Sequence, residues 1–401
     1  MLADIYPDLL VVIGKELSPS DRQSLRAVST TLRGTIAPLF FASAPLILSL
    51  ERLATHPWQD AAGWLRYGQH LVIRSLSLDE SFKTPRSLQK LLGDFLEPMD
   101  KLRSLNWTLL TGDFPWAQRL VVDLIARSDK LESLSLYDHM SCVDDFPSLP
   151  PVSNLRVLWV QTRYRGWASR FTPWMCDAVQ HSPRLEALSL PSDTNASVFF
   201  ARLHKQGTRL RRLHVANSHE MLTAYLASYA DTLEELYIQR AVGDAAAADA
   251  FFHAVLPRHR STLRALSIPG YSEGRWSFGA HNLEEIVQLR GLHTLEMTVN
   301  SDEYLSPKRG YGCMADDIEL FLYIALSLPT VTSIALFPAV AAGRRSNSAI
   351  ERHLEVTQRK ITAEVERVCG EREEAVAMVL VGTQHRRARE MDRAGRCLRS
   401  G

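Results

Sequence analysis

A short pattern of apolar positions, apolar-x-x-apolar-x-apolar, recurs along the middle of the chain. Ten copies are present, and they begin at Ile73, Leu102, Leu131, Leu155, Leu185, Leu210, Leu233, Leu263, Leu292 and Val331. Successive copies start 23 to 39 residues apart, and five of the nine intervals are 29 or 30 residues. One match means little in a leucine-rich chain, but ten at a similar spacing indicate an internal repeat.

Each copy predicts a short strand that follows a helix. Residues 120–127 and 222–229, which precede two of the copies, carry apolar side chains at helical spacing. A polar break, such as residues 128–130, separates each helix from its strand, in which alternate residues point to the same face. One such unit cannot bury its apolar face alone, so the copies are expected to stack and to align their strands in a parallel sheet.

These repeats resemble the leucine-rich-repeat family, in its longer, helix-backed subtype, over residues 73–337. The resemblance implies an α/β solenoid. Many family members place Asn or Cys three residues after the last strand position, and here only Asn300 does so. The irregular spacing and the missing Asn positions therefore favour an irregular arc. The alternative is a chain of unrelated α/β units such as a doubly wound fold, although no GxGxxG follows a predicted strand.

A purely helical pattern occupies the first forty residues. Leu9, Leu10, Ile13 and Leu17 share one face of a helix that begins after Pro7, and Ser18-Pro19-Ser20 ends it. The Ser-x-x-Gln spacing at residues 20–23 predicts a capped second helix, and a third apolar segment follows at residues 36–41. Three short helices cannot bury a sufficient core, so they need a partner, either the end of the repeats or another protein.

The order of these N-terminal residues resembles an F-box, and its position directly before a leucine-rich array strengthens the resemblance. In that family the helices dock on a Skp-type adaptor and through it on a cullin scaffold. The resemblance assigns adaptor binding to Pro7, Leu9, Leu10, Ile13, Leu17, Leu25 and Val28. Two positions depart from the family pattern: Tyr6 stands where Leu is usual, and Arg22 where an apolar residue is common. The alternative is a plain helical cap for the first repeat.

The chain therefore divides into five predicted parts. A strand at residues 46–50 and a helix at residues 51–69 are expected to cap the repeats, and a helix at 349–369 with a strand at 375–381 is expected to close them. The parts are an F-box-like helical domain at 1–41, a cap and linker at 42–72, leucine-rich repeats at 73–340, a C-terminal cap helix and strand at 341–384, and a basic tail, predicted to be disordered, at 385–401.

Composition and charge narrow the class of protein. The chain has 46 Lys and Arg against 45 Asp and Glu, so it has no net field to hold nucleic acid or an anionic membrane. Its five cysteines form no CxxC pair, which argues against a disulfide framework or a zinc finger. The first eight residues do not fit a signal peptide, and the longest apolar stretch is broken by Pro38 and Pro45. We expect a cytoplasmic or nuclear protein, or one found in both, with no membrane or nucleic-acid partner.

Motifs for chemistry are absent from the sequence. It contains no HExxH, GxSxG, GxxxxGK[ST] or kinase signature, and its 13 histidines are scattered. We therefore expect no catalytic residues, no metal and no cofactor. What remains is a binding surface on the strand face opposite the motif leucines, where aromatic residues beside Arg are typical of interfaces. The predicted target-binding residues are Tyr137, Trp159, Gln161, Arg163, Arg212, His214, Glu235 and Tyr237.

Together these patterns predict a substrate-recognition subunit of an SCF-type ubiquitin ligase, which performs no chemistry itself. Its N-terminal helices would dock on the adaptor and its repeats would hold an unidentified target protein. The alternative is a leucine-rich-repeat interaction scaffold, outside any ligase, whose N-terminal helices only cap the solenoid.

Overall fold

The structure, a computed structural model, describes most of the 401 residues. The described residues are 7–55, 61–77, 85–139, 147–162, 167–192, 194–241, 245–302, 313–340, 347–370 and 378–381. They fall into two compact units, residues 1–185 and residues 186–401. The boundary between the units lies inside the segment predicted to hold the repeats.

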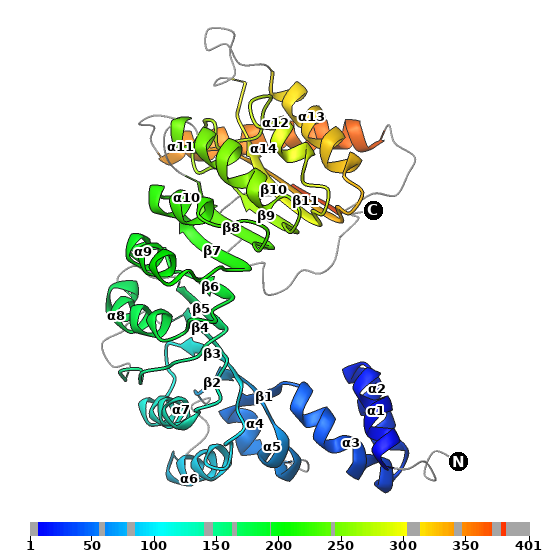
Figure 1. The fold of residues 1–401 in the computed structure, drawn as a ribbon, viewed down its shortest axis with the longest axis vertical. Coiled ribbons are helices and arrows are strands. Elements are labelled where there is room, and N and C mark those ends of the chain that lie inside the picture. The colour runs from blue at the N-terminus through cyan, green and yellow to red at the C-terminus, as the bar shows by residue number, and fades with distance from the viewer. Residues whose placement is uncertain are drawn as a thin grey trace. The chain divides into compact units, whose positions relative to one another are not determined.

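The first unit begins with helices and continues with alternating strands and helices. Its elements are α1 (Pro7–Glu16), α2 (Pro19–Val28), α3 (Thr30–Ser43), β1 (Leu46–Ser49), α4 (Leu50–Thr55), α5 (Ala61–Tyr67), β2 (His70–Ser75), α6 (Pro85–Leu96), β3 (Ser104–Leu110), α7 (Pro115–Arg127), β4 (Ser133–His139), β5 (Val157–Thr162) and α8 (Trp167–Gln180). Strands β1 to β5 pair in chain order and all in parallel. Helices α6, α7 and α8 lie on one side of β2 to β5 (Figure 1).

The second unit repeats the same alternation. Its elements are β6 (Ala187–Ser189), α9 (Ala196–Gln206), β7 (Arg212–Asn217), α10 (Glu220–Ala227), β8 (Glu235–Arg240), α11 (Ala245–Ala250), a π-helical turn (Phe251–Val255), a 3-10 turn (Leu256–His259), β9 (Ala265–Ile268), α12 (Leu283–Val287), β10 (Thr294–Val299), α13 (Met314–Ser327), β11 (Ser333–Pro338), α14 (Asn347–Gly370) and β12 (Met378–Val381). Strands β6 to β12 also pair in parallel and in chain order. The predicted α/β class is therefore confirmed in both units.

The strand register explains why the apolar pattern repeats. In the first unit Leu71, Leu105, Leu134 and Leu158 are consecutive partners across β2 to β5, and each is fully buried. The second unit aligns its motif residues in the same way, for example along Leu188, Leu213, Leu236, Leu266, Leu295 and Ile334. Because side chains alternate along a strand, this register keeps one apolar row under the helices throughout each unit.

The first predicted copy has the wrong register. The sequence pattern aligned Ile73 with Leu102, but the strands pair Ile73 with Trp107 and Leu71 with Leu105. The first strand therefore lies five residues earlier than the motif placed it. Leu76, which the motif put at the centre of the strand, follows β2 and donates its backbone N–H to the carboxylate of Asp113.

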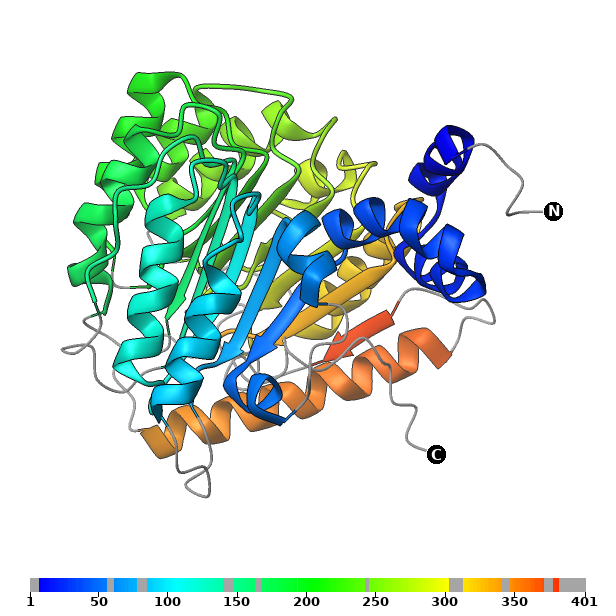
Figure 2. The same ribbon diagram turned by 90° about the horizontal axis from the view of Figure 1, so that it is seen from below.

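Most of the helices and strands expected on either side of the repeats are present, with modified bounds. The strand expected at 46–50 is β1, the helix expected at 349–369 is α14, and β12 provides the closing strand, beside which α14 runs in Figure 2. The single helix expected at 51–69 is wrong: α4 ends at Thr55 and α5 begins at Ala61. The predicted basic tail, residues 385–401, lies outside the described residues.

The N-terminal helices pack around α3. Leu10 of α1 is buried with Leu32 and Ile36 of α3, and a Cβ at Gly14 would lie 2.8 Å from the Cδ1 of Ile36. Ser18, not the predicted Ser20, caps α2, because its Oγ accepts the N–H of Asp21 at 3.1 Å while Pro19 takes the first helical position. These contacts give the three short helices a small core of their own.

A second contact joins these helices to the cap of the repeats. Phe41 of α3 packs edge-on against Trp64 of α5, with ring centroids 4.9 Å apart. Gly63 provides the space, because a Cβ there would lie 2.1 Å from the Cε2 of Phe41. Helix α3 therefore closes the N-terminal end of the first unit, and α1 and α2 pack on α3 rather than on the strands.

Two glycine substitutions test this contact. Gly63→Ala is expected to lower the free energy of unfolding by about 1–3 kcal/mol, because the added methyl group overlaps the ring of Phe41. Gly34→Ala in α3 is the matched control, since nothing lies within 4 Å of its Cβ. Gly34→Ala is expected to raise the free energy of unfolding by about 0.5–1 kcal/mol through helix propensity. Urea unfolding of both variants measures the difference in the free energy of unfolding. Equal effects of the two substitutions would contradict the contact between Phe41 and the helix that carries Gly63.

Candidate functional site

Helix α1 exposes an apolar face. Leu9, Val12 and Ile13 lie at the i, i+3 and i+4 positions that share one side of a helix, and they are 54%, 57% and 44% exposed. We call these three residues the α1 face. Val28, the last residue of α2, is 64% exposed. Isolated exposed aliphatic residues are common, but three adjacent ones on a ten-residue helix form a candidate docking surface.

The other predicted adaptor-binding residues are placed differently. Leu10 is only 1% exposed and belongs to the core with α3, so it supports the α1 face and does not reach a partner. Leu17 and Leu25 are half-buried. Pro7 is the first residue of α1, and its side chain lies outside the described part of the chain, as does Tyr6.

Arg22, which departs from the family pattern, joins the three helices. Its Nε donates to the carbonyl of Gly14 at 2.7 Å and its Nη2 to the carbonyl of Lys15 at 2.9 Å. Its Nη1 donates to Ser43 Oγ at 2.6 Å. The carbonyls at the end of α1 have no partners within the helix, so the guanidinium satisfies them and fixes α1 against α2 and α3. The departure from the family pattern thus has a structural role.

The predicted target-binding residues fall into two groups, one in each unit. In the first unit Tyr137 of β4 pairs with Gln161 of β5, next to Trp159, and all three are half-buried on the face opposite the motif leucines. Arg163 lies outside the described residues. The structure therefore brings three of the four predicted residues of this unit together on two adjacent strands.

In the second unit the predicted residues also form neighbouring pairs. Arg212 of β7 pairs with Glu235 of β8, and His214 pairs with Tyr237, whose ring stacks on the imidazole at 3.9 Å between centroids. Burial, with a smaller contribution from Arg212, lowers the pKa of His214 to about 3. His214 is therefore neutral at physiological pH, and its ring packs within the surface instead of carrying charge to a ligand.

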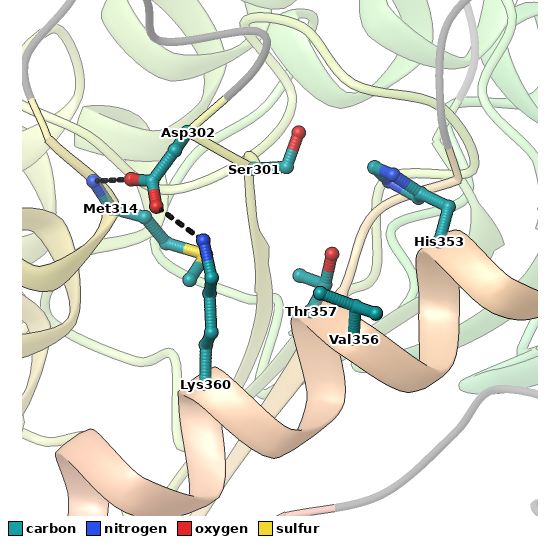
Figure 3. Close-up of a pocket in the computed structure, with 7 residues that line it drawn as sticks. All are labelled: Ser301, Asp302, Met314, His353, Val356, Thr357 and Lys360. Atoms are coloured by element: carbon teal, nitrogen blue, oxygen red, sulfur yellow. Dashed lines mark hydrogen bonds and ion pairs between the residues drawn. The ribbon is translucent and has the colours of Figure 1, made fainter.

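A cavity that no sequence pattern predicted lies beside α14 (Figure 3). It has a volume of about 180 Å³ and is lined by Ser301, Asp302, Met314, His353, Val356, Thr357 and Lys360. These residues come from the segment that follows β10, the start of α13 and three successive turns of α14. No short motif links them, because the segments are far apart in the sequence and each residue type is ordinary.

The charged groups of this cavity are already paired. Asp302 accepts the backbone N–H of Met314 at 2.9 Å and the ammonium of Lys360 at 2.8 Å. Burial alone raises the pKa of Asp302, but the hydrogen bonds from Lys360 and Met314 outweigh burial and the pKa is lowered. Beside them, Glu273 accepts the backbone N–H of Ser301 at 3.2 Å, and its Oε1 lies 3.5 Å from the Nε2 of His353.

Other sites of known chemical type are not found in the described part of the chain. Among those residues no three His, Cys, Asp or Glu side chains gather where they would hold a metal ion. Within the same residues, no helix combines the length and apolar character needed to cross a bilayer. No protein-family model matches the chain, and no curated protein matches it.

Proposed function

We propose that the chain is a substrate-recognition subunit of an SCF-type ubiquitin ligase. Its N-terminal helices act as an F-box and dock on a Skp-type adaptor, which links the chain to a cullin scaffold. Its helix–strand units act as leucine-rich repeats and hold a target protein. The chain itself contributes no chemistry, since the ligase acts by holding the target near a ubiquitin-loaded partner.

The α1 face carries this proposal. Leu9, Val12 and Ile13 are each about half exposed, and completing the burial of three such side chains gains about 2–4 kcal/mol. Leu10 and Arg22 hold the helix so that this face points away from α3. An apolar helix face fixed by a small core of its own is the arrangement that a helix-docking partner requires.

The scaffold alternative leaves the α1 face unexplained. Capping of the first unit is performed by α3, whose Phe41 packs on Trp64 and over Gly63. The apolar side chains of the α1 face take no part in that contact, so capping alone gives no reason for them. Deleting residues 1–41 is a poor test, because it also removes Phe41 and destabilises the protein under either function. Substitutions on the α1 face separate the two functions.

For target binding, the two half-buried strand surfaces are the proposed contact regions. Tyr137, Trp159 and Gln161 form the surface of the first unit, and Arg212 with Glu235 forms part of that of the second. Aromatic residues and Arg dominate the energetics of protein interfaces, because they bury large areas and keep hydrogen-bonding groups.

Capture of the adaptor tests the proposal. Ile13→Asp is expected to reduce recovery of a Skp-type adaptor with the full-length protein by about tenfold or more, because a charge replaces a buried apolar contact. Leu91→Asp in α6 is the matched control, since Leu91 and Ile13 are both 44% exposed. Both variants should unfold at the temperature of the wild type. The ligase role is wrong if the wild type recovers no adaptor, or if Ile13→Asp recovers as much as Leu91→Asp.

A further inference from the structure

We propose that the open face of β3, β4 and β5 in the first unit binds an extended, uncharged segment of a target protein. Helices α6, α7 and α8 lie on the other side of these strands (Figure 1). Every second residue of 104–110, 133–139 and 157–161 belongs to the open face and is half-buried, whereas the residues between them are buried. The three strands pair side by side, so their open sides form one continuous surface.

The open face carries six uncharged polar side chains. They are Ser104, Asn106, Thr108, Ser133, Ser135 and Gln161. None of these side chains forms a hydrogen bond with another described residue. Their hydroxyl and amide groups can both donate and accept, so a ligand that displaces water from them must offer hydrogen-bonding groups of both kinds. A peptide backbone does so, because almost every residue carries one N–H and one C=O.

The open face has no permanent charge, since none of its residues on β3, β4 and β5 is Asp, Glu, Lys or Arg. Arg103 and Glu132, which precede β3 and β4, pair with each other at 3.3 Å. Asp138 is buried on the opposite side of β4 and accepts the hydroxyl of Thr162 at 2.8 Å. On the adjoining β2, Arg74 stands at the margin. A charged side chain at the centre of this face would lose water and gain no counter-charge, which is unfavourable. The face therefore selects against acidic and basic segments.

The spacing of the polar side chains suits an extended peptide. Residues on one face of a strand repeat about every 6.8 Å, because each residue rises about 3.4 Å. The backbone N–H and C=O groups on one side of an extended peptide repeat at the same interval. A peptide that runs along β4 therefore meets Ser133 and Ser135 in step.

Apolar side chains on the same face favour a peptide over a sugar chain. Trp159 stands beside Ser135 in the strand register, and aromatic rings stack on sugars as well as on peptides. Two aliphatic residues decide between these ligands: Leu110 ends β3, Val157 begins β5, and both are half-buried. Aliphatic side chains gain free energy by contact with other apolar groups, which an uncharged peptide supplies between its amide groups.

This inference rests on the proposed function for its target, but its experiment needs no adaptor. Ile13→Asp changes the α1 face and should bind the same peptides as the wild type. Ser135→Asp changes the open face of the first unit and should recover a Skp-type adaptor as well as the wild type does. Failure of adaptor capture and failure of peptide binding are therefore separate results.

Selection from a phage-displayed library of random peptides on the full-length protein tests the proposal. The selected peptides should contain fewer Asp, Glu, Lys and Arg residues than the library. Ser135→Asp places a charge at the centre of the face and should weaken binding of a selected synthetic peptide by about tenfold or more. Asn106→Asp adds a charge with almost no change of shape and should act in the same direction. Ser333→Asp is the matched control, since Ser333 is a half-buried serine on a strand of the second unit.

A second selection, on Ser135→Asp itself, should return peptides that carry Lys or Arg, because the new carboxylate attracts a base. Maltoheptaose, an uncharged sugar chain, is the competing probe. The proposal is overturned if no peptide selected on the wild type is lost in Ser135→Asp and Asn106→Asp, or if Ser333→Asp weakens binding as much. Peptides that are as charged as the library, or binding of maltoheptaose in place of peptides, would also overturn it.

Discussion

Asp113→Ala is expected to lower the free energy of unfolding by about 2–6 kcal/mol at pH 5. Asp113 is 6% exposed, and its carboxyl oxygens accept two backbone N–H groups, from Leu76 at 2.7 Å and from Leu110 at 3.0 Å. Leu76 follows β2 and Leu110 ends β3, so this one side chain joins two successive helix–strand units. Alanine leaves both donors buried without a partner, at about 1–3 kcal/mol each.

Two further substitutions of acidic residues serve as comparisons for the effect of Asp113→Ala on the free energy of unfolding. Asp113→Asn keeps one acceptor oxygen and turns its amide nitrogen toward the other donor, so about half of the loss is expected. Asp94→Ala in α6 removes an exposed carboxylate and should change the free energy of unfolding by less than about 0.5 kcal/mol. Urea unfolding measures all three variants. An Asp113→Ala effect no larger than that of Asp94→Ala would show that the two hydrogen bonds do not stabilise the junction.

The sequence predicts the repeat well because the same physical constraint acts in every copy. A strand that buries one face under a helix must carry apolar residues at alternate positions, and the register between strands keeps them aligned, as at Leu105 and Leu134. Where apolar residues also follow the strand, the pattern alone is ambiguous. Leu76 fits the motif with Ile73, whereas Leu71 does not, because Gly68 stands three residues before it. Only the pairing of Leu71 with Leu105 shows that Leu71 holds the strand position.

The surface sites depend on tertiary contacts that periodicity does not contain. Leu9 and Leu10 are equally apolar neighbours, and packing on α3 decides that Leu10 is buried while Leu9 is exposed. Arg22 bonds to backbone groups 7 and 8 residues away, and Asp113 bonds to the backbone of Leu76, 37 residues away, which no local spacing reveals. The cavity beside α14 is of the same kind, because Asp302 and Lys360 are far apart in the sequence and meet only when α14 packs on the preceding units, against α13 and β11.

The stability of the protein is also expected to depend on pH through Asp113. Burial raises the pKa of this carboxyl to about 6, in spite of the hydrogen bonds from Leu110 and Leu76, whereas in the unfolded chain it stays near 4. The folded protein therefore holds an extra proton between pH 4 and pH 6. This proton stabilises the folded protein by about 3 kcal/mol. The stabilisation is complete below pH 4 and is lost as the pH rises through 6.

A comparison of variants isolates this contribution. Burial and the neighbouring Asp316 also raise the pKa of Asp317 to about 6. The pH dependence of the wild-type stability therefore contains contributions from both Asp113 and Asp317. The difference in the free energy of unfolding between the wild type and Asp113→Asn contains Asp113 only, because Asn does not titrate. That difference should shrink by about 3 kcal/mol between pH 4 and pH 7 in urea unfolding. If it grows instead, hydrogen bonding to the ionised carboxylate outweighs its burial, and the pKa of Asp113 in the folded protein lies below that of the unfolded chain.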